Sequence, residues 1–110
     1  MKTYIFRVIG KVQGVYYRAN TQKNASQLGY QGSVKNLKNG DVEVIATLKD
    51  DRLEDFVSLL KKGSPNSKVS NIDYIEVKNI NFDSFSILYW DYITYDTQER
   101  NLSIKVASFL

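Results

Sequence analysis

The stretch YIFRVIGKVQGVYYR, residues 4–18, contains the change of pattern that decides the fold. In its first part Tyr4, Phe6 and Val8 alternate with other residues, which predicts a strand with one apolar face. Gly10 and Gly14 then interrupt the alternation. Beyond them, the residues that share one helical face are Tyr17, Thr21, Ala25 and Leu28. The chain is therefore expected to begin with a strand, a glycine turn and a helix, which Gly29 ends.

The later strands are identified by the same alternation. They are expected over residues 33–37, 41–48, 69–77 and 82–89. Asn39-Gly40 predicts a hairpin turn between the first two of these, because Asn-Gly readily adopts the positive φ that such turns need.

A second helix is expected between residues 48 and 69. Its apolar stripe is formed by Leu53, Phe56, Val57 and Leu60. Asp50 or Asp51 is the expected N-terminal cap, and Glu54 completes a capping box if Asp51 is the cap. Gly63 and Pro65 mark the end of the helix.

The order strand–helix–strand–strand–helix–strand is that of a split βαβ unit. We therefore expect an α+β, ferredoxin-like sandwich in which two helices cover one face of an antiparallel sheet. Residues 1–89 form this domain, and residues 90–110 are a C-terminal extension of unknown role. Because Leu102, Ile104 and Val106 alternate in the extension, one more strand is a hypothesis there, either within the sheet or in self-association with a second chain.

The composition excludes several classes of enzyme. The 110 residues include no cysteine and no histidine. Thiol nucleophiles, thiolate metal sites and serine–histidine triads are therefore excluded. Any catalysis must rest on carboxylates, Lys, Arg, Tyr, amides, hydroxyls or the backbone. The net charge of +3 favours an anionic ligand, which includes both small phosphates and nucleic acid.

The sequence also indicates where the protein acts. No apolar run approaches the length that spans a bilayer. Residues 1–4 lead directly into a strand-like segment containing Arg7, unlike a secretory signal. We therefore expect a cytoplasmic protein without membrane contact.

The turn between the first strand and the first helix is a candidate phosphate site. Backbone N–H groups of a glycine-bearing turn can point at one anion, and the helix dipole behind them favours negative charge. Arg18 adds a planar pair of donors that matches two phosphate oxygens. No Gly-Lys-Ser/Thr follows, so the turn is not a Walker loop, and the third glycine of a dinucleotide fingerprint is missing. Taken alone, this pattern is also compatible with an ordinary glycine turn and an arginine that is exposed to solvent.

Residues 10–18 resemble the signature of acylphosphatases, in which Val-Gln-Gly-Val is followed two residues later by an essential Arg. Residues 34–36 resemble the family's Val-x-Asn, and residues 39–43 its second signature. Counterparts also exist for residues 63–65 and 85–87, so the resemblance runs in order from about residue 4 to residue 89. It implies metal-independent hydrolysis of the carboxyl–phosphate bond of acyl phosphates to a carboxylate and inorganic phosphate. No metal and no cofactor are expected.

The resemblance also implies a role for each site residue. Arg18 and Asn36 are the expected catalytic residues, with Asn36 orienting the attacking water. The expected phosphate-binding residues are Gln13, Gly14, Val15, Tyr16, Tyr17 and Arg18, chiefly through their backbone N–H groups.

Other residues near these motifs receive structural interpretations. The side chains of Tyr16 and Tyr17 are expected to pack. Glu43 and the carboxylates around the second helix are expected to be solvated or capping groups and not an acid–base pair. Ser33 stands where the family often has an aromatic residue, and Tyr16 where a smaller or apolar one is frequent. These two departures are expected to affect packing, the rim of the pocket or its acyl side.

Two alternatives stay open beside the enzyme. RNA-recognition modules share the topology, but residues 41–48 contain no aromatic residue on which bases could stack, which argues against nucleic acid. The other alternative is a non-catalytic domain that binds phosphate or interacts through its extension.

Overall fold

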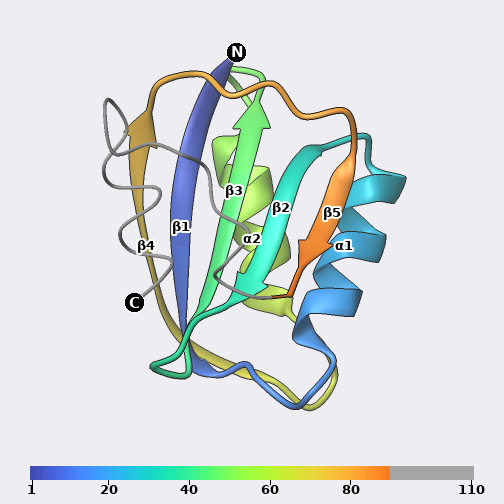
Figure 1. Ribbon diagram of the computed structural model, residues 1–110, viewed down its shortest axis with the longest axis vertical. Helices are drawn as coiled ribbons and strands as arrows, with labels where there is room; N and C mark the ends of the chain where they lie inside the picture. Colours follow the sequence, from blue (N-terminus) through green and yellow to red (C-terminus); the bar gives the residue numbers. More distant parts are fainter. Residues whose placement is uncertain (90–110) are drawn as a thin grey trace.

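A five-stranded sheet with two helices on one face forms the architecture of the computed structural model, which describes residues 1–89 (Figure 1). The strand order is β4-β1-β3-β2-β5. The elements are β1 (Lys2–Lys11), α1 (Tyr17–Gln27), β2 (Gln31–Asn36), β3 (Val42–Leu48), α2 (Leu53–Lys62), β4 (Lys68–Val77) and β5 (Phe85–Leu88). The ferredoxin-like α+β fold is confirmed. The hypothesis of an added strand falls on residues 90–110 and lies outside the described residues.

The expectation of an antiparallel sheet holds for β1 to β4 but is wrong for β5, which runs parallel to β2. Gly32 pairs with Phe85 and Val34 with Ile87. The physical reason is the path of the segment between β4 and β5, which crosses one end of the sheet from edge to edge (Figure 1). After this crossing β5 descends in the same direction as β2, so both strands end on the same side.

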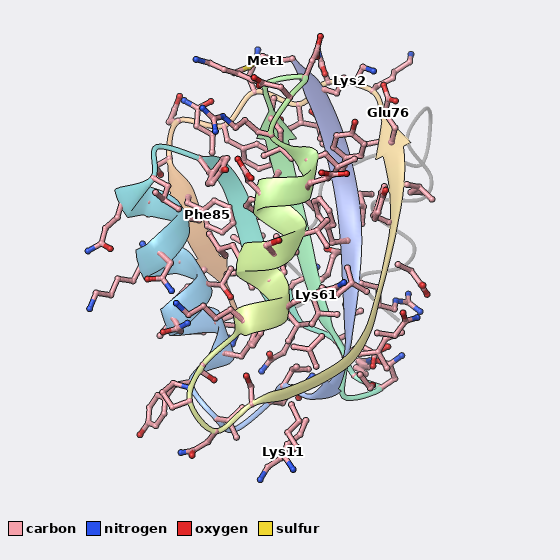
Figure 2. All side chains as sticks on the ribbon, turned by 180° about the vertical axis from the view of Figure 1, so that it is seen from behind. Met1, Lys2, Lys11, Lys61, Glu76 and Phe85 are labelled. Atoms are coloured by element: carbon pink, nitrogen blue, oxygen red, sulfur yellow. The ribbon has the colours of Figure 1, made fainter. Side chains whose placement is uncertain are left out.

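The core lies between the sheet and the two helices (Figure 2). Phe6 of β1 packs against Phe56 of α2, with 5.2 Å between ring centroids. From α1, the residues buried as expected are Tyr17, Thr21 and Ala25. Leu28 is 67% exposed, contrary to expectation, because α1 ends at Gln27 and Leu28 is its C-cap.

The two caps of α2 agree only in part with those expected from the sequence. Gly63 occupies the C-cap as expected. The expected capping box is wrong, because Arg52 is the N-cap residue and no side chain caps the helix. Arg52 instead donates a hydrogen bond of 3.0 Å from Nη1 to Oδ2 of Asp55.

The face of the sheet opposite the helices carries a buried ion pair. Lys35 and Glu43 are cross-strand neighbours on β2 and β3, with 3.9 Å between Nζ and Oε1. The expectation that Glu43 is solvated is therefore wrong, since only 4% of it is exposed. Ser33 is buried on the same face between Ile45 and Ser86, so it does not open the rim of the site.

Candidate active site

The β1–α1 loop, residues 12–16, has a backbone that few residues adopt readily. Gly14 has φ 73° and Tyr16 has φ 62°, both in the left-handed region. Val12 and Val15 are buried beneath the loop and fix it to the core. Tyr16 is the N-cap of α1. The loop therefore enters α1 through two residues with a left-handed backbone, Gly14 and Tyr16, while two buried valines anchor it to the core.

Side chains and carbonyls from the end of α2 hold the loop and the first turns of α1. Ser64 Oγ donates a hydrogen bond of 2.7 Å to the carbonyl of Val15, and this contact is buried. The hydroxyl of Tyr17 donates to the carbonyl of Leu60, also at 2.7 Å. Asn20 Nδ2 completes the set with a 2.9 Å bond to the carbonyl of Gly63. The carbonyls of Val15, Leu60 and Gly63 thereby each accept a hydrogen bond.

The N–H groups of the loop have no such partner. Among residues 1–89, no acceptor bonds the backbone N–H groups of residues 13–18. The first N–H groups of a helix lack intrahelical acceptors and carry the positive end of its dipole. A run of donors of this kind is the physical requirement for binding an anion.

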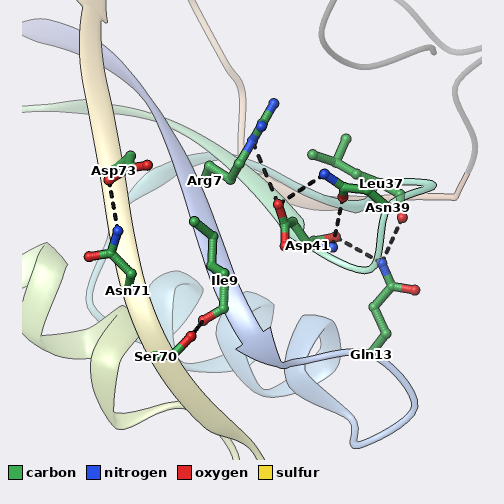
Figure 3. Close-up of polar contacts among 9 residues, drawn as sticks. All are labelled: Arg7, Ile9, Gln13, Leu37, Asn39, Asp41, Ser70, Asn71 and Asp73. Carbon is green, nitrogen blue, oxygen red and sulfur yellow. Dashed lines mark hydrogen bonds and ion pairs between the residues drawn. The ribbon is translucent and has the colours of Figure 1, made fainter.

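Gln13 fastens the loop to the β2–β3 turn, residues 37–41 (Figure 3). Its side-chain Nε2 donates to the carbonyl of Leu37 at 2.7 Å and to that of Asp41 at 2.8 Å. The turn is braced within itself by Asn39, whose Oδ1 accepts the N–H of Asp41 at 3.0 Å. Gln13 is thus a structural clamp through its side chain, a role that the sequence motif did not reveal.

Asn36 is the last residue of β2, directly before the turn that Gln13 holds. Its side-chain Oδ1 is buried and has no hydrogen-bond partner within residues 1–89. An unpartnered buried acceptor is costly unless a ligand or water supplies a donor. The site therefore offers one free acceptor beside the free donors of the loop.

Arg18 and Asn36 line the same open hollow of about 400 Å³. Gly14, Tyr16 and Tyr17 contribute to its wall, and so do four residues outside the predicted set, Val12, Ala19, Ile87 and Tyr89. A second hollow of about 330 Å³ also contains Arg18 and Asn36, together with Gln13. Leu37, Lys38 and Tyr89 complete its lining. The structure therefore brings together most of the predicted site residues, whereas Val15 lies beneath them.

The two tyrosines of the motif differ in environment. Tyr17 packs in the core as expected, and burial raises the pKa of its hydroxyl well above the ordinary value. The same expectation is wrong for Tyr16, which is 83% exposed because its left-handed backbone turns the side chain outward. Tyr17 therefore stays protonated at neutral pH, and Tyr16 is free to meet a ligand.

Tyr89 was missed as a site residue. Its ring centroid lies 5.2 Å from Cζ of Arg18, a cation–π distance. The sequence offered one weak signal, an aromatic residue at the end of the last strand, which has meaning only once β5 is known to lie beside β2.

Two features are absent from residues 1–89. In this part of the chain no three acidic side chains gather in a group that could hold a metal ion. None of its helices is long and apolar enough to cross a membrane.

Comparison with known proteins identifies relatives over the same segment. The acylphosphatase family model matches residues 4–87. An acylphosphatase of Legionella pneumophila is 40% identical over 96 residues, which are 87% of this chain and 91% of the relative. One from Rhizorhabdus wittichii is 39% identical over 79 residues, 72% of this chain and 80% of that protein.

The fold comparison agrees. The crystal structure of acylphosphatase from Bacillus subtilis superposes with a TM-score of 0.75 at 39% identity, covering 81% of this chain and 100% of that one. Sequence and fold point to the same proteins, and the chain belongs to the acylphosphatase family.

Proposed function

We propose that this acylphosphatase, a hydrolase of acid anhydrides, cleaves small acyl phosphates without a metal ion, with Arg18 and the β1–α1 loop binding the phosphoryl group and Asn36 orienting water. Family membership supports the reaction. One observation carries the assignment of residues: the unpartnered Oδ1 of Asn36 lies in the same hollow as Arg18.

Phosphoryl binding follows from the donors. The N–H groups of residues 13–18 have no acceptor within residues 1–89, and Arg18 makes no ion pair there. Both sets of donors are therefore available to phosphoryl oxygens. Charge on these oxygens is stabilised through the transition state by donors that are already oriented.

Asn36 supplies the acceptor that a water molecule needs. A water that donates one hydrogen bond to Oδ1 is held with a lone pair free to attack phosphorus. As the new P–O bond forms, the bond from phosphorus to the carboxyl oxygen breaks, and its electron pair leaves with the carboxylate. Because an amide is no base at neutral pH, the proton of the water passes to a phosphoryl oxygen or to solvent.

The chemistry needs neither a metal ion nor a strong general acid. The carboxylate is a good leaving group, so it departs without protonation. Arg18 carries the positive charge that a metal ion provides in other phosphoryl transfers. Hydrolysis should therefore continue in the presence of a chelator.

The proposed substrate is a small acyl phosphate, and the proposed products are a carboxylate and inorganic phosphate. The aromatic side chains of β1, Tyr4 and Phe6, contact the ring of Tyr74 on the helix-covered side of the sheet, which supports a small ligand over nucleic acid. A cytoplasmic location and self-association through residues 90–110 remain predictions, which cell fractionation and sedimentation would check.

The test is hydrolysis of acetyl phosphate and benzoyl phosphate in the presence of a chelator. The native chain should turn over both substrates. Arg18→Ala should lose both phosphate affinity and turnover, by about 10²-fold or more in kcat/KM. Asn36→Ala should keep its affinity for inorganic phosphate but lose a similar factor in kcat.

Matched controls separate the site from general damage. Arg52→Ala removes an exposed arginine far along the chain, and Asn71→Ala removes an exposed asparagine of β4. Both should behave as the native chain. No turnover by the native chain would favour the non-catalytic alternative. Full activity of Arg18→Ala would refute the site assignment while leaving the activity standing.

A further inference from the structure

The ring of Tyr89 lies beside the guanidinium of Arg18. Arg18 Cζ lies 5.2 Å from the ring centroid, within the range of a cation–π interaction. Within residues 1–89, the Arg18 side chain forms no hydrogen bond and no ion pair. In the described part of the chain, no carboxylate or carbonyl therefore sets the direction of this long side chain.

The fold delivers Tyr89 to this position through β5. Tyr89 directly follows β5, which runs parallel to β2, and β2 ends at Asn36. Tyr89 lines both hollows that contain Arg18 and Asn36. Tyr89 is 58% exposed, so it lies at the open site and is not part of the core.

An aromatic ring orients an arginine differently from a carboxylate. A carboxylate would occupy the N–H groups of the guanidinium, which are the donors that bidentate phosphate binding uses. A ring attracts the cation through the negative electrostatic potential of its face and takes none of these donors. An arginine held by a ring has already lost rotamer freedom, yet it still offers every N–H group to a ligand.

We propose that Tyr89 is a positioning residue, whose ring holds the Arg18 guanidinium in the phosphate-binding orientation before the substrate arrives. This rests on the proposed role of Arg18 in binding the phosphoryl group. It assigns to the end of β5 a function in the reaction, and it makes the aromatic face, not the hydroxyl, the part of Tyr89 that matters.

The experiment compares Tyr89→Phe and Tyr89→Leu in the full 110-residue chain. Phenylalanine keeps the aromatic face, and leucine keeps apolar bulk without it. The measurements are the Kd of inorganic phosphate and the kcat and KM for acetyl phosphate and benzoyl phosphate. Tyr89→Leu should weaken phosphate binding by about two- to fivefold, the size of an exposed cation–π contact, and Tyr89→Phe should restore it. Tyr74→Leu, at an exposed tyrosine of β4, is the matched control and should leave the Kd unchanged.

A double variant ties the effect to Arg18. In an Arg18→Ala background, Tyr89→Leu should weaken phosphate binding no further, because the group that the ring holds is gone. An equal loss in that background would overturn the proposal. Weaker binding of phosphate by Arg18→Ala alone tests the proposed function separately.

Two other outcomes also overturn the positioning role. One is an unchanged phosphate Kd in Tyr89→Leu. The other is a raised KM for benzoyl phosphate alone, which would assign the ring to the acyl group. Thermal unfolding checks that each variant is folded, and Tyr89→Met replaces the leucine variant if that chain does not fold.

Discussion

The side-chain amide of Gln13 donates a hydrogen bond of 2.7 Å to the carbonyl oxygen of Leu37, which joins the β1–α1 loop to the β2–β3 turn. Asn36 lies immediately before that turn, and Arg18 follows the loop. The distance between Asn36, which is proposed to orient the water, and Arg18, which is proposed to bind phosphate, therefore depends on a hydrogen bond in which neither residue takes part.

Gln13→Leu should reduce kcat for acetyl phosphate by about tenfold, because small displacements of oriented groups are costly to the rate. The affinity for inorganic phosphate should change much less, since the backbone N–H groups remain. Gln22→Leu is the control, because Gln22 also donates to a carbonyl, that of Phe85 at 3.2 Å, but outside both hollows. An unchanged kcat in Gln13→Leu would show that the clamp has no part in catalysis.

Ser64→Ala should lower the free energy of unfolding by about 1–3 kcal/mol, because it leaves the buried carbonyl of Val15 without its donor. Urea denaturation measures this change. Ser70→Ala removes a similar bond, 2.9 Å to the carbonyl of Ile9, in an exposed position, and should cost less than about 0.5 kcal/mol. Equal losses in the two variants would contradict the structural role of Ser64.

Gly32→Ala should cost about 4 kcal/mol or more, or prevent folding altogether. A Cβ at this position would lie 2.0 Å from the carbonyl oxygen of Ile45, a backbone atom that β2–β3 pairing holds in place. Ser33→Ala, one residue along the same strand, adds no bulk and should fold. Circular dichroism of both variants measures whether they fold. A native-like spectrum of Gly32→Ala would refute the close approach between position 32 and the carbonyl oxygen of Ile45.

Tyr17 gives the protein a distinct sensitivity to alkaline pH. Burial raises the pKa of Tyr17 above its ordinary value of 10.0, so above pH 10 the unfolded chain releases a proton that the folded chain keeps. The stability that Tyr17 contributes is therefore complete below pH 10. It falls by about 1.4 kcal/mol for each further pH unit until the folded protein also titrates.

Tyr17→Phe removes this titration together with the bond to Leu60. Below pH 9 the variant should be about 1 kcal/mol less stable than the native chain. As the pH rises to 11 the difference should shrink and then change sign. Urea denaturation of both proteins between pH 8 and pH 11 provides the measurement, and a constant difference would contradict the burial of a neutral phenol.

Much of the fold was readable because local patterns determine local elements. The alternation through Phe6 and Val8 predicted β1, and Gly63 predicted the end of α2. The direction of β5 was not readable, because it depends on which way the preceding segment crosses the sheet. The burial of Glu43 was missed for a similar reason, since its partner Lys35 is supplied by the neighbouring strand.

The candidate site, like the fold, could be predicted from the sequence only in part. The resemblance placed Arg18 and Asn36 in one site, and the structure brings them into one hollow, although their roles remain predictions. The outward position of Tyr16 follows from a left-handed φ that its residue type does not suggest. Gln13 and Tyr89 act through partners distant in sequence, the carbonyl of Leu37 and the guanidinium of Arg18.

The parallel pairing of β5 with β2 has a consequence for folding. It joins Gly32 to Phe85, and it brings Tyr89, the residue after β5, beside Arg18. A folding chain in which β5 is not yet paired would therefore lack the ring beside Arg18. Full affinity for phosphate should therefore return during refolding only once β5 has paired with β2, so that the affinity reports the completed topology.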